Sequence, residues 1–128
     1  MDTTLDDGHR QLGRIARQLF ESRCPMDRVR QLEADGPAHL PDLWTEMAGL
    51  DWLSLTYPEA LGGPGGTMVD LTVIYQEMGR ALVPSPHLAS AVIAGEALVR
   101  DGSGRHRDLL VAMVAGETIV VPALTEPD

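Results

Sequence analysis

The sequence predicts an all-α fold, an antiparallel bundle of about six helices that ends in one short β-strand. Apolar residues recur at intervals of three and four through most of the 128 residues, which is the pattern of helices with one buried face. Proline, glycine and capping residues divide that pattern into segments of helical length. Only residues 118–124 carry a run of β-type apolar residues without this spacing.

The first two helices are predicted within the first 36 residues. The apolar stripe of the first helix consists of Leu12, Ile15, Ala16, Leu19 and Phe20. Asp6 and Asp7 lie near its start, where the helix dipole favours acidic side chains, and Pro25 ends it. A short helix over residues 26–34 follows and stops at Gly36.

The third helix begins at Pro41, since proline suits the first helical position, and Gly49 is a plausible stop. One face of this helix is apolar and consists of Leu43, Trp44, Met47 and Leu50. Trp44 and Trp52 both have apolar neighbours. We therefore expect both indoles to be buried and to bracket the packing of this helix on the helix of residues 67–83.

In the middle of the chain, the sequence predicts an extended segment over residues 53–58, a loop over residues 59–66 and then a helix over residues 67–83. Thr67 can cap this helix, with Asp70 at the third helical position, where a capping box places an acid. The apolar stripe runs on to about Val83.

Two further helices and a strand complete the prediction. Ser85 and Pro86 form a cap and first-turn pair that opens a helix to about residue 99. The last helix begins at Ser103 or Gly104 and is ended by Gly116. Residues 118–124 then read as a strand. A strand without a neighbour leaves backbone donors and acceptors unpaired, so these residues alone do not show what this strand would pair with.

Composition excludes several classes of function. The net charge is −9, and ten arginines face nineteen acidic residues, so nucleic acid, which is bound through basic residues, is not an expected partner. No apolar run approaches the roughly 20 residues of a transmembrane helix, and the acidic N-terminus is no signal peptide. We expect a soluble cytoplasmic protein. Cys24 lies at helical spacing from Phe20 and fits a buried structural thiol better than a nucleophile.

No catalytic or metal site follows from the residues alone. The glycine-rich stretch of residues 62–66 lacks the lysine of a phosphate-binding loop, because the sequence contains no lysine. We interpret it as a loop that needs permissive backbone angles. The four histidines are far apart in the sequence and lack zinc-site spacing. No glutamate stands out as a catalytic base, and we predict neither catalytic nor metal-binding residues.

Three stretches together resemble the N-terminal helical domain of the acyl-CoA dehydrogenase family. They are LWTEMAGLDWLSLTYPEALGGPGG, IYQEMGRAL and LLVAMVAGETIVVPALTEPD, which follow one another in the family's order and spacing. The resemblance covers residues 12–128. It implies an N-terminal helical domain over residues 1–116 and the start of a middle β-domain over residues 117–128, with a C-terminal four-helix bundle beyond.

The family oxidises the Cα–Cβ bond of acyl-CoA thioesters, so the resemblance implies an FAD-dependent oxidoreductase of lipid metabolism. A glutamate removes the α-proton while the β-hydrogen leaves as hydride to the flavin, which requires the two acceptors on opposite sides of one bond. In the family this base lies in the C-terminal bundle, and most of the FAD site also lies beyond the helical domain. We therefore expect FAD in the complete enzyme and none on the isolated chain.

The resemblance assigns five residues. Thr125 matches the family threonine that meets the flavin, and Leu124 matches its neighbour at the ring. By spacing, Leu88, Ala89 and Val92 fall on the helix that lines the acyl-chain pocket; as residues alone they fit a helical core equally well. Pro122 departs from the usual residue of that strand and removes a ladder donor.

Two hypotheses remain open at this point. The chain is either part of an acyl-CoA dehydrogenase, contributing pocket wall and assembly surface, or a standalone helical module derived from that family. The first implies an acyl-CoA substrate in the complete enzyme, with the β-domain and bundle supplied by the rest of the protein or by a complementary subunit. It also implies a homo-oligomer. Neither implies nucleic acid or a membrane.

Overall fold

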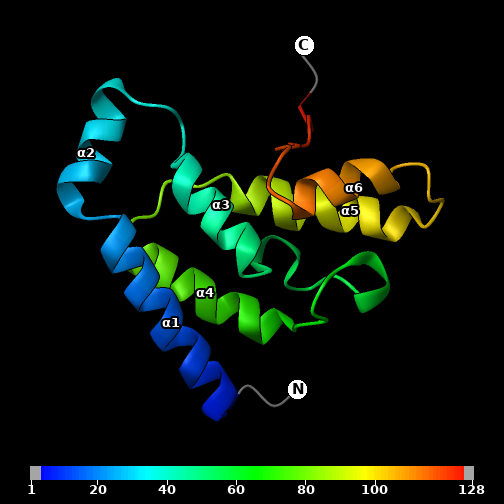
Figure 1. The fold of residues 1–128 in the computed structure, drawn as a ribbon, viewed down its shortest axis with the longest axis horizontal. Coiled ribbons are helices and arrows are strands. Elements are labelled where there is room, and N and C mark those ends of the chain that lie inside the picture. The colour runs from blue at the N-terminus through cyan, green and yellow to red at the C-terminus, as the bar shows by residue number, and fades with distance from the viewer. Residues whose placement is uncertain (1–3, 126–128) are drawn as a thin grey trace. The chain divides into compact units, whose positions relative to one another are not determined.

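The computed structural model describes residues 4–125, and these residues form helices joined by turns and loops (Figure 1). The α-helices within this range are α1 (Asp7–Arg23), α2 (Met26–Asp35), α3 (Pro41–Gly49), α4 (Met68–Arg80), α5 (Gly95–Asp101) and α6 (Arg107–Val114). A π-helix, η3 (Leu88–Ala94), leads directly into α5, and two short 3₁₀ turns are η1 (Trp52–Ser54) and η2 (Glu59–Leu61). The predicted all-α class with six helical segments is confirmed.

The described residues form two compact units. The first unit consists of residues 4–40 and 66–84, and the second unit of residues 41–65 and 85–125. Each unit has its own buried side chains, and each is described separately below.

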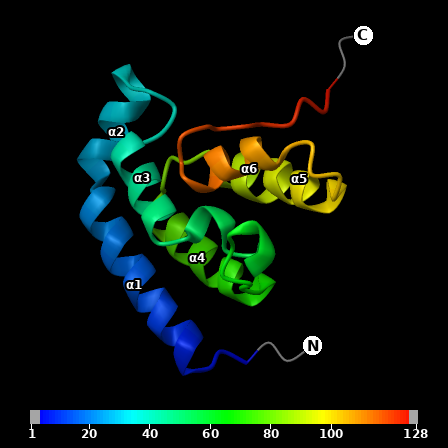
Figure 2. The ribbon, with the colours of Figure 1, turned by 45° about the vertical axis from the view of Figure 1, so that its right-hand side comes forward.

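The first unit is built on the pairing of α1 with α4, which lie side by side (Figures 1 and 2). Their buried faces include Ala16 and Phe20 of α1 and Leu71 and Ile74 of α4. His9 lies near Asp70 at one end, and Arg17 bonds to Glu77 further along. The two helices therefore run in parallel, so the antiparallel arrangement expected for the bundle does not apply to this pair.

Both helices of this pair begin with a capping box. The backbone N–H of His9 donates to the Asp6 carboxylate at 2.8 Å, and the Asp6 N–H donates to the His9 ring at 3.2 Å. The Thr67 N–H donates to the Asp70 carboxylate at 2.7 Å, and the Asp70 N–H donates to the Thr67 hydroxyl at 3.3 Å. The predicted cap at Thr67 is thus confirmed, and it satisfies donors that a helix start leaves unpaired.

The second unit packs α3, η1, η3, α5 and α6 around a common core. Its buried apolar side chains are Leu43, Trp44, Met47, Trp52, Leu53, Tyr57, Ala91, Ala94, Leu110 and Met113. Trp44 and Trp52 are each 4% exposed, so their predicted burial is confirmed, while their packing against the helix of residues 67–83 stays a prediction.

The predicted extended segment over residues 53–58 is wrong. Asp51 adopts a left-handed conformation with φ of 59°, which ends α3, and the chain continues as turns. The N–H of Ser54 bonds to Asp51 C=O at 3.3 Å, and the N–H of Tyr57 bonds to Ser54 C=O at 2.8 Å. Local turn hydrogen bonds therefore satisfy the backbone that the prediction left to a strand.

The predicted strand over residues 118–124 is also not formed. None of residues 4–125 is in a β-strand, so no ladder is available to this segment. Thr118 N–H bonds to Ala112 C=O at 3.3 Å, and Val120 N–H bonds to the Ser90 hydroxyl at 3.2 Å. Glu126, Pro127 and Asp128 of the family-like turn lie outside the described residues.

Candidate functional site

The five residues that the sequence singled out all lie in the second unit. Leu88, Ala89 and Val92 lie on η3, where Leu88 is 54% exposed and the other two are half-buried. Leu124 is 79% exposed, and Thr125 is also exposed. The structure brings the three η3 residues together on one short helix. Leu124 and Thr125 follow four and five residues after Val120, which is bonded to Ser90 of η3.

The π-register of η3 leaves one carbonyl group for a partner outside the helix. The Gly95 N–H reaches the carbonyls of Ser90 and Val92 and passes over that of Ala91, its partner in a regular α-helix. The Tyr57 hydroxyl donates to the Ala91 carbonyl at 2.5 Å. Because a buried carbonyl without a partner costs stability, this contact accounts for how η3 tolerates its irregular register.

Glycines on two segments make room for Tyr57. A Cβ added to Gly95 would overlap the Tyr57 hydroxyl oxygen, and one added to Gly63 would overlap the Tyr57 carbonyl. The Gly65 N–H bonds to that same carbonyl at 3.0 Å. The glycine-rich loop is therefore wrapped around Tyr57. Positive φ angles at Gly62 and Gly65 support its interpretation as a loop that needs permissive backbone angles.

His87 anchors the start of η3. Its side chain is buried, and its Nε2 lies 2.9 Å from the Trp52 carbonyl. A carbonyl only accepts, so this nitrogen carries the ring proton. Burial lowers the pKa of His87, because the charged imidazolium would lose its hydration. The His87 ring is therefore neutral, with its proton on Nε2, and it anchors the chain before η3.

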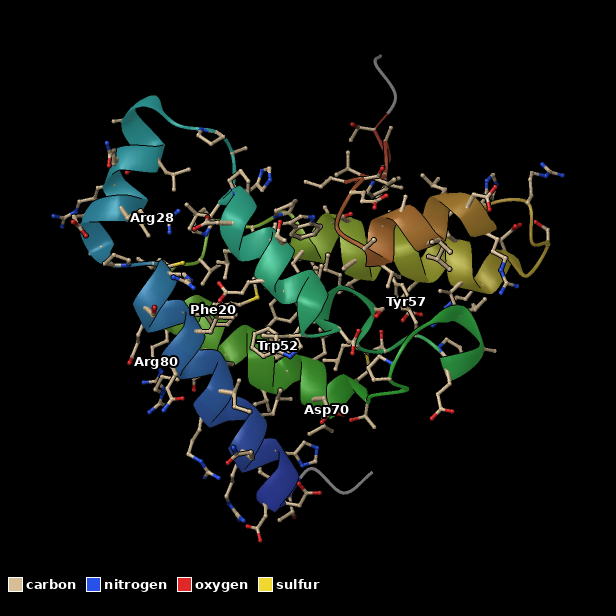
Figure 3. The ribbon with its side chains drawn as sticks, viewed as in Figure 1. Phe20, Arg28, Trp52, Tyr57, Asp70 and Arg80 are labelled. Atoms are coloured by element: carbon tan, nitrogen blue, oxygen red, sulfur yellow. The ribbon has the colours of Figure 1, made fainter. Side chains whose placement is uncertain are left out.

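A carboxylate lies next to Tyr57. The Thr56 hydroxyl donates to Glu96 at 2.6 Å. Burial raises the pKa of the Tyr57 hydroxyl, and the negative charge of Glu96 raises it further. The phenol thus keeps its proton and remains a donor to Ala91. Figure 3 labels Tyr57 and Trp52, the two aromatic residues whose segments hold η3.

The described residues offer no cluster suited to a metal ion and no helix long and apolar enough to cross a membrane. The most buried carboxylate of the first unit, on Glu77, is paired with Arg17 and Arg80. Glu77 is thus engaged in a structural contact, and we take the apolar surface of η3, where the resemblance places three residues, as the candidate site.

Sequence reasoning missed Tyr57, His87 and Gly95. A glycine inside an otherwise helical pattern is a known sign of a packing or functional constraint, so Gly95 was the one available signal. The partners of these residues are 34 to 38 positions away along the chain, and no local pattern reveals such contacts.

A model of the family described as "Acyl-CoA dehydrogenase, N-terminal domain" matches residues 6–117. Acyl-CoA dehydrogenase FadE27 of Mycobacterium tuberculosis is 29% identical over 125 residues, which are 97% of this chain and 34% of that protein. IpdE2 of the same organism, also an acyl-CoA dehydrogenase, is 51% identical over 39 residues, which are 30% of this chain and 12% of IpdE2.

Solved structures of acyl-CoA dehydrogenases are also similar to this chain. The ChsE4-ChsE5 complex of Mycobacterium tuberculosis contains a chain with 28% identity and a TM-score of 0.82, covering 94% of this chain and 34% of that one. A variant of the Tcur3481-Tcur3483 steroid ACAD gives 34% identity and a TM-score of 0.83, covering 96% and 34%. The chain spans about a third of the length of FadE27 and of these structures. With a family match over residues 6–117 and the same helical fold, the chain belongs to the acyl-CoA dehydrogenase family, of which it carries the N-terminal domain.

Proposed function

We propose that this chain acts as the N-terminal part of a flavin-dependent acyl-CoA dehydrogenase. The observation that carries the proposal is the family match over residues 6–117, supported by relatives named as acyl-CoA dehydrogenases. We place the helical domain at residues 1–116 and assign residues 117–128 to the entrance of the β-domain. A standalone interaction module is not favoured, because the relatives that match this chain are named as acyl-CoA dehydrogenases.

The contribution of this chain to the reaction would be to hold the acyl group. Leu88, Ala89 and Val92 would provide one apolar wall, which excludes water and orients the chain so that its Cα–Cβ bond meets the reacting groups. The open surface at Leu88, which is 54% exposed, is free to take this role. The catalytic base and most of the flavin site would come from the β-domain and bundle.

The family implies FAD in the complete enzyme, where it accepts the β-hydrogen as hydride. Leu124 is 79% exposed and Thr125 is exposed, so an apolar side chain and a hydroxyl are both free to meet a flavin ring. These two residues fit one edge of a flavin site. We assign them that contact and no further role.

The solved relatives indicate where to look for the substrate and the partner. The Tcur3481-Tcur3483 protein is described as a steroid ACAD, and the ChsE4-ChsE5 protein is described as a complex. We therefore propose a thioester of CoA with a bulky, steroid-type acyl group as the first substrate to test. A complementary subunit is the first partner to test.

The proposal is tested on the native protein that holds this sequence, purified from its source together with any bound subunit. We expect visible flavin absorbance and reduction of an electron-accepting dye with at least one acyl-CoA. A flavin-free preparation that is inactive on both linear and steroid-type acyl-CoA thioesters would overturn the proposal. The 128-residue chain alone should bind no FAD tightly and should reduce no dye.

A further inference from the structure

Tyr57 contacts η3 from outside the helix, at the turn where the π-register occurs. Its hydroxyl donates to the Ala91 carbonyl at 2.5 Å, while the Gly95 N–H donates to the carbonyl of Ser90, five residues earlier. The hydroxyl has room there because residue 95 has no Cβ. The last turn of η3 therefore contains one residue more than a turn of an α-helix. The Tyr57 hydroxyl and the missing side chain of Gly95 make this possible.

The extra residue changes which side chains share the exposed face of η3. Leu88 and Ile93 are the most exposed apolar residues of this helix, at 54% and 43%, and they are five positions apart. In an α-helix, neighbours on one face are three or four positions apart, so Val92 would take the place beside Leu88. Each residue turns the α-helix by about 100°, so a change of register would replace Ile93 by Val92 on this face.

We infer that Tyr57 is a positioning residue for the acyl-binding surface. Through the Ala91 carbonyl it holds η3 in the register that presents Leu88 together with Ile93, and so it sets the shape of acyl group that fits. The link to the acyl group rests on the proposed function, whereas the control of register does not.

Neighbouring contacts keep Tyr57 in place for this role. Tyr57 is 1% exposed, and its backbone carbonyl accepts a hydrogen bond from the Gly65 N–H at 3.0 Å. At the other end of η3, His87 is fixed to the Trp52 carbonyl at 2.9 Å. His87, directly before η3, and Tyr57, at its last turn, thus hold the two ends of this helix.

The register is tested by cysteine labelling of the 128-residue chain. Cys24 is buried and is the only natural cysteine, so it serves as a slow background. We expect Ile93→Cys to react with a maleimide faster than Val92→Cys. The difference in labelling rate should be lost when both cysteine variants also carry Tyr57→Phe, which removes the hydroxyl. It should likewise be lost when they carry Gly95→Ala, whose Cβ would occupy the position of the Tyr57 hydroxyl. Tyr75→Phe, which removes a hydroxyl from half-buried Tyr75 of α4, should leave the difference unchanged.

The link to substrate shape is tested on the active native protein. Tyr57→Phe should change the ratio of kcat/KM for a steroid-type acyl-CoA to that for a short linear acyl-CoA by about tenfold, through KM, since small changes in an apolar pocket have effects of this size. Tyr75→Phe should leave the ratio unchanged. An active wild type whose labelling or acyl preference does not respond to Tyr57→Phe and Gly95→Ala overturns the inference. An inactive wild type overturns the proposed function instead, and the labelling result still decides the register.

Discussion

Glu77 is the most buried carboxylate among the described residues, and two arginines surround it. Its side chain is 6% exposed, and it accepts bonds from Arg17 at 2.9 and 3.0 Å and from Arg80 at 3.1 Å. The bond from Arg17 is the main cause that lowers the pKa of Glu77, and the charge and bond of Arg80 add to it. A buried charge is tolerated because it is paired in this way.

Replacing Glu77 by glutamine should lower the free energy of unfolding by about 1–3 kcal/mol at neutral pH, because charge-assisted bonds to both arginines are lost. A carboxylate with a lowered folded pKa stabilises above its ordinary value of 4.5 and loses that effect as pH falls through the folded pKa. The wild type should therefore lose stability below about pH 4.5, and Glu77→Gln should lack this part of the fall. Urea unfolding at several pH values measures both effects.

Glu33→Gln is the matched control, since Glu33 is exposed on α2. It should change stability by less than about 0.5 kcal/mol, as surface substitutions do. If both variants lose equal stability, or if Glu77→Gln keeps the full acid-dependent fall, the structural role of the Arg17–Glu77–Arg80 cluster is contradicted.

Trp44→Ala should destabilise the protein by about 3–5 kcal/mol, because a large buried ring is removed and leaves a cavity. Trp44 is 4% exposed, and a Cβ on Gly116 would lie 3.6 Å from its ring. Gly116, two residues after the end of α6, has a positive φ that disfavours side chains, so this position offers no side chain to fill the cavity. Urea unfolding gives the value, and a loss below about 1 kcal/mol would contradict the packing described.

At the scale of elements, the sequence predicted best where the cause of structure is local. Thr67 caps α4 and Pro41 begins α3, as the sequence predicted, and Asp6, expected near the start of α1, is its cap. Each signal acts within three or four residues. The strand predicted for residues 118–124 failed because a strand depends on a neighbour, and residues 4–125 contain none. The apolar run there reflects sequence composition, whereas the ladder depends on tertiary structure.

The candidate site was predictable only in part, for the same reason. The family resemblance, by spacing from the Thr-Glu-Pro turn, assigned Leu88, Ala89 and Val92 to one helix, and the structure has them on one helix. The π-register was not predictable, because it depends on a hydroxyl from Tyr57, which is 34 residues before Ala91. Tertiary contacts of this kind override local periodicity.

Removing the cap of α4 should have a smaller effect than removing a core residue. Thr67→Ala should lower the free energy of unfolding by about 1 kcal/mol, since it leaves the Asp70 N–H without its capping acceptor. Thr72→Ala is the matched control on the same helix, because Thr72 is exposed and its hydroxyl bonds only to Met68 C=O. Thermal unfolding should place Thr72→Ala near the wild type; equal losses would show that the cap contributes nothing specific.

At the scale of the whole molecule, apolar side chains remain exposed on the second unit. They are Leu50, Leu88, Ile93, Val111, Ile119, Val121 and Leu124. Exposed apolar side chains at Ile119, Val121 and Leu124 lie on one segment without a strand partner among the described residues, and such a segment favours association. The net charge of −9 opposes nonspecific aggregation, which favours a defined assembly over a precipitate.

The 128-residue chain alone should accordingly show either rapid amide exchange over residues 118–124 or a dimer that pairs these segments. Val120 is held by Ser90 at 3.2 Å, so its amide should exchange more slowly than those of Val121 and Leu124. Hydrogen exchange and light scattering over a dilution series separate the two outcomes, because pairing should protect these amides only at concentrations where the dimer is present. A strictly monomeric chain with strong protection throughout residues 118–124 would contradict the prediction, since the segment would then have an internal partner within the same molecule.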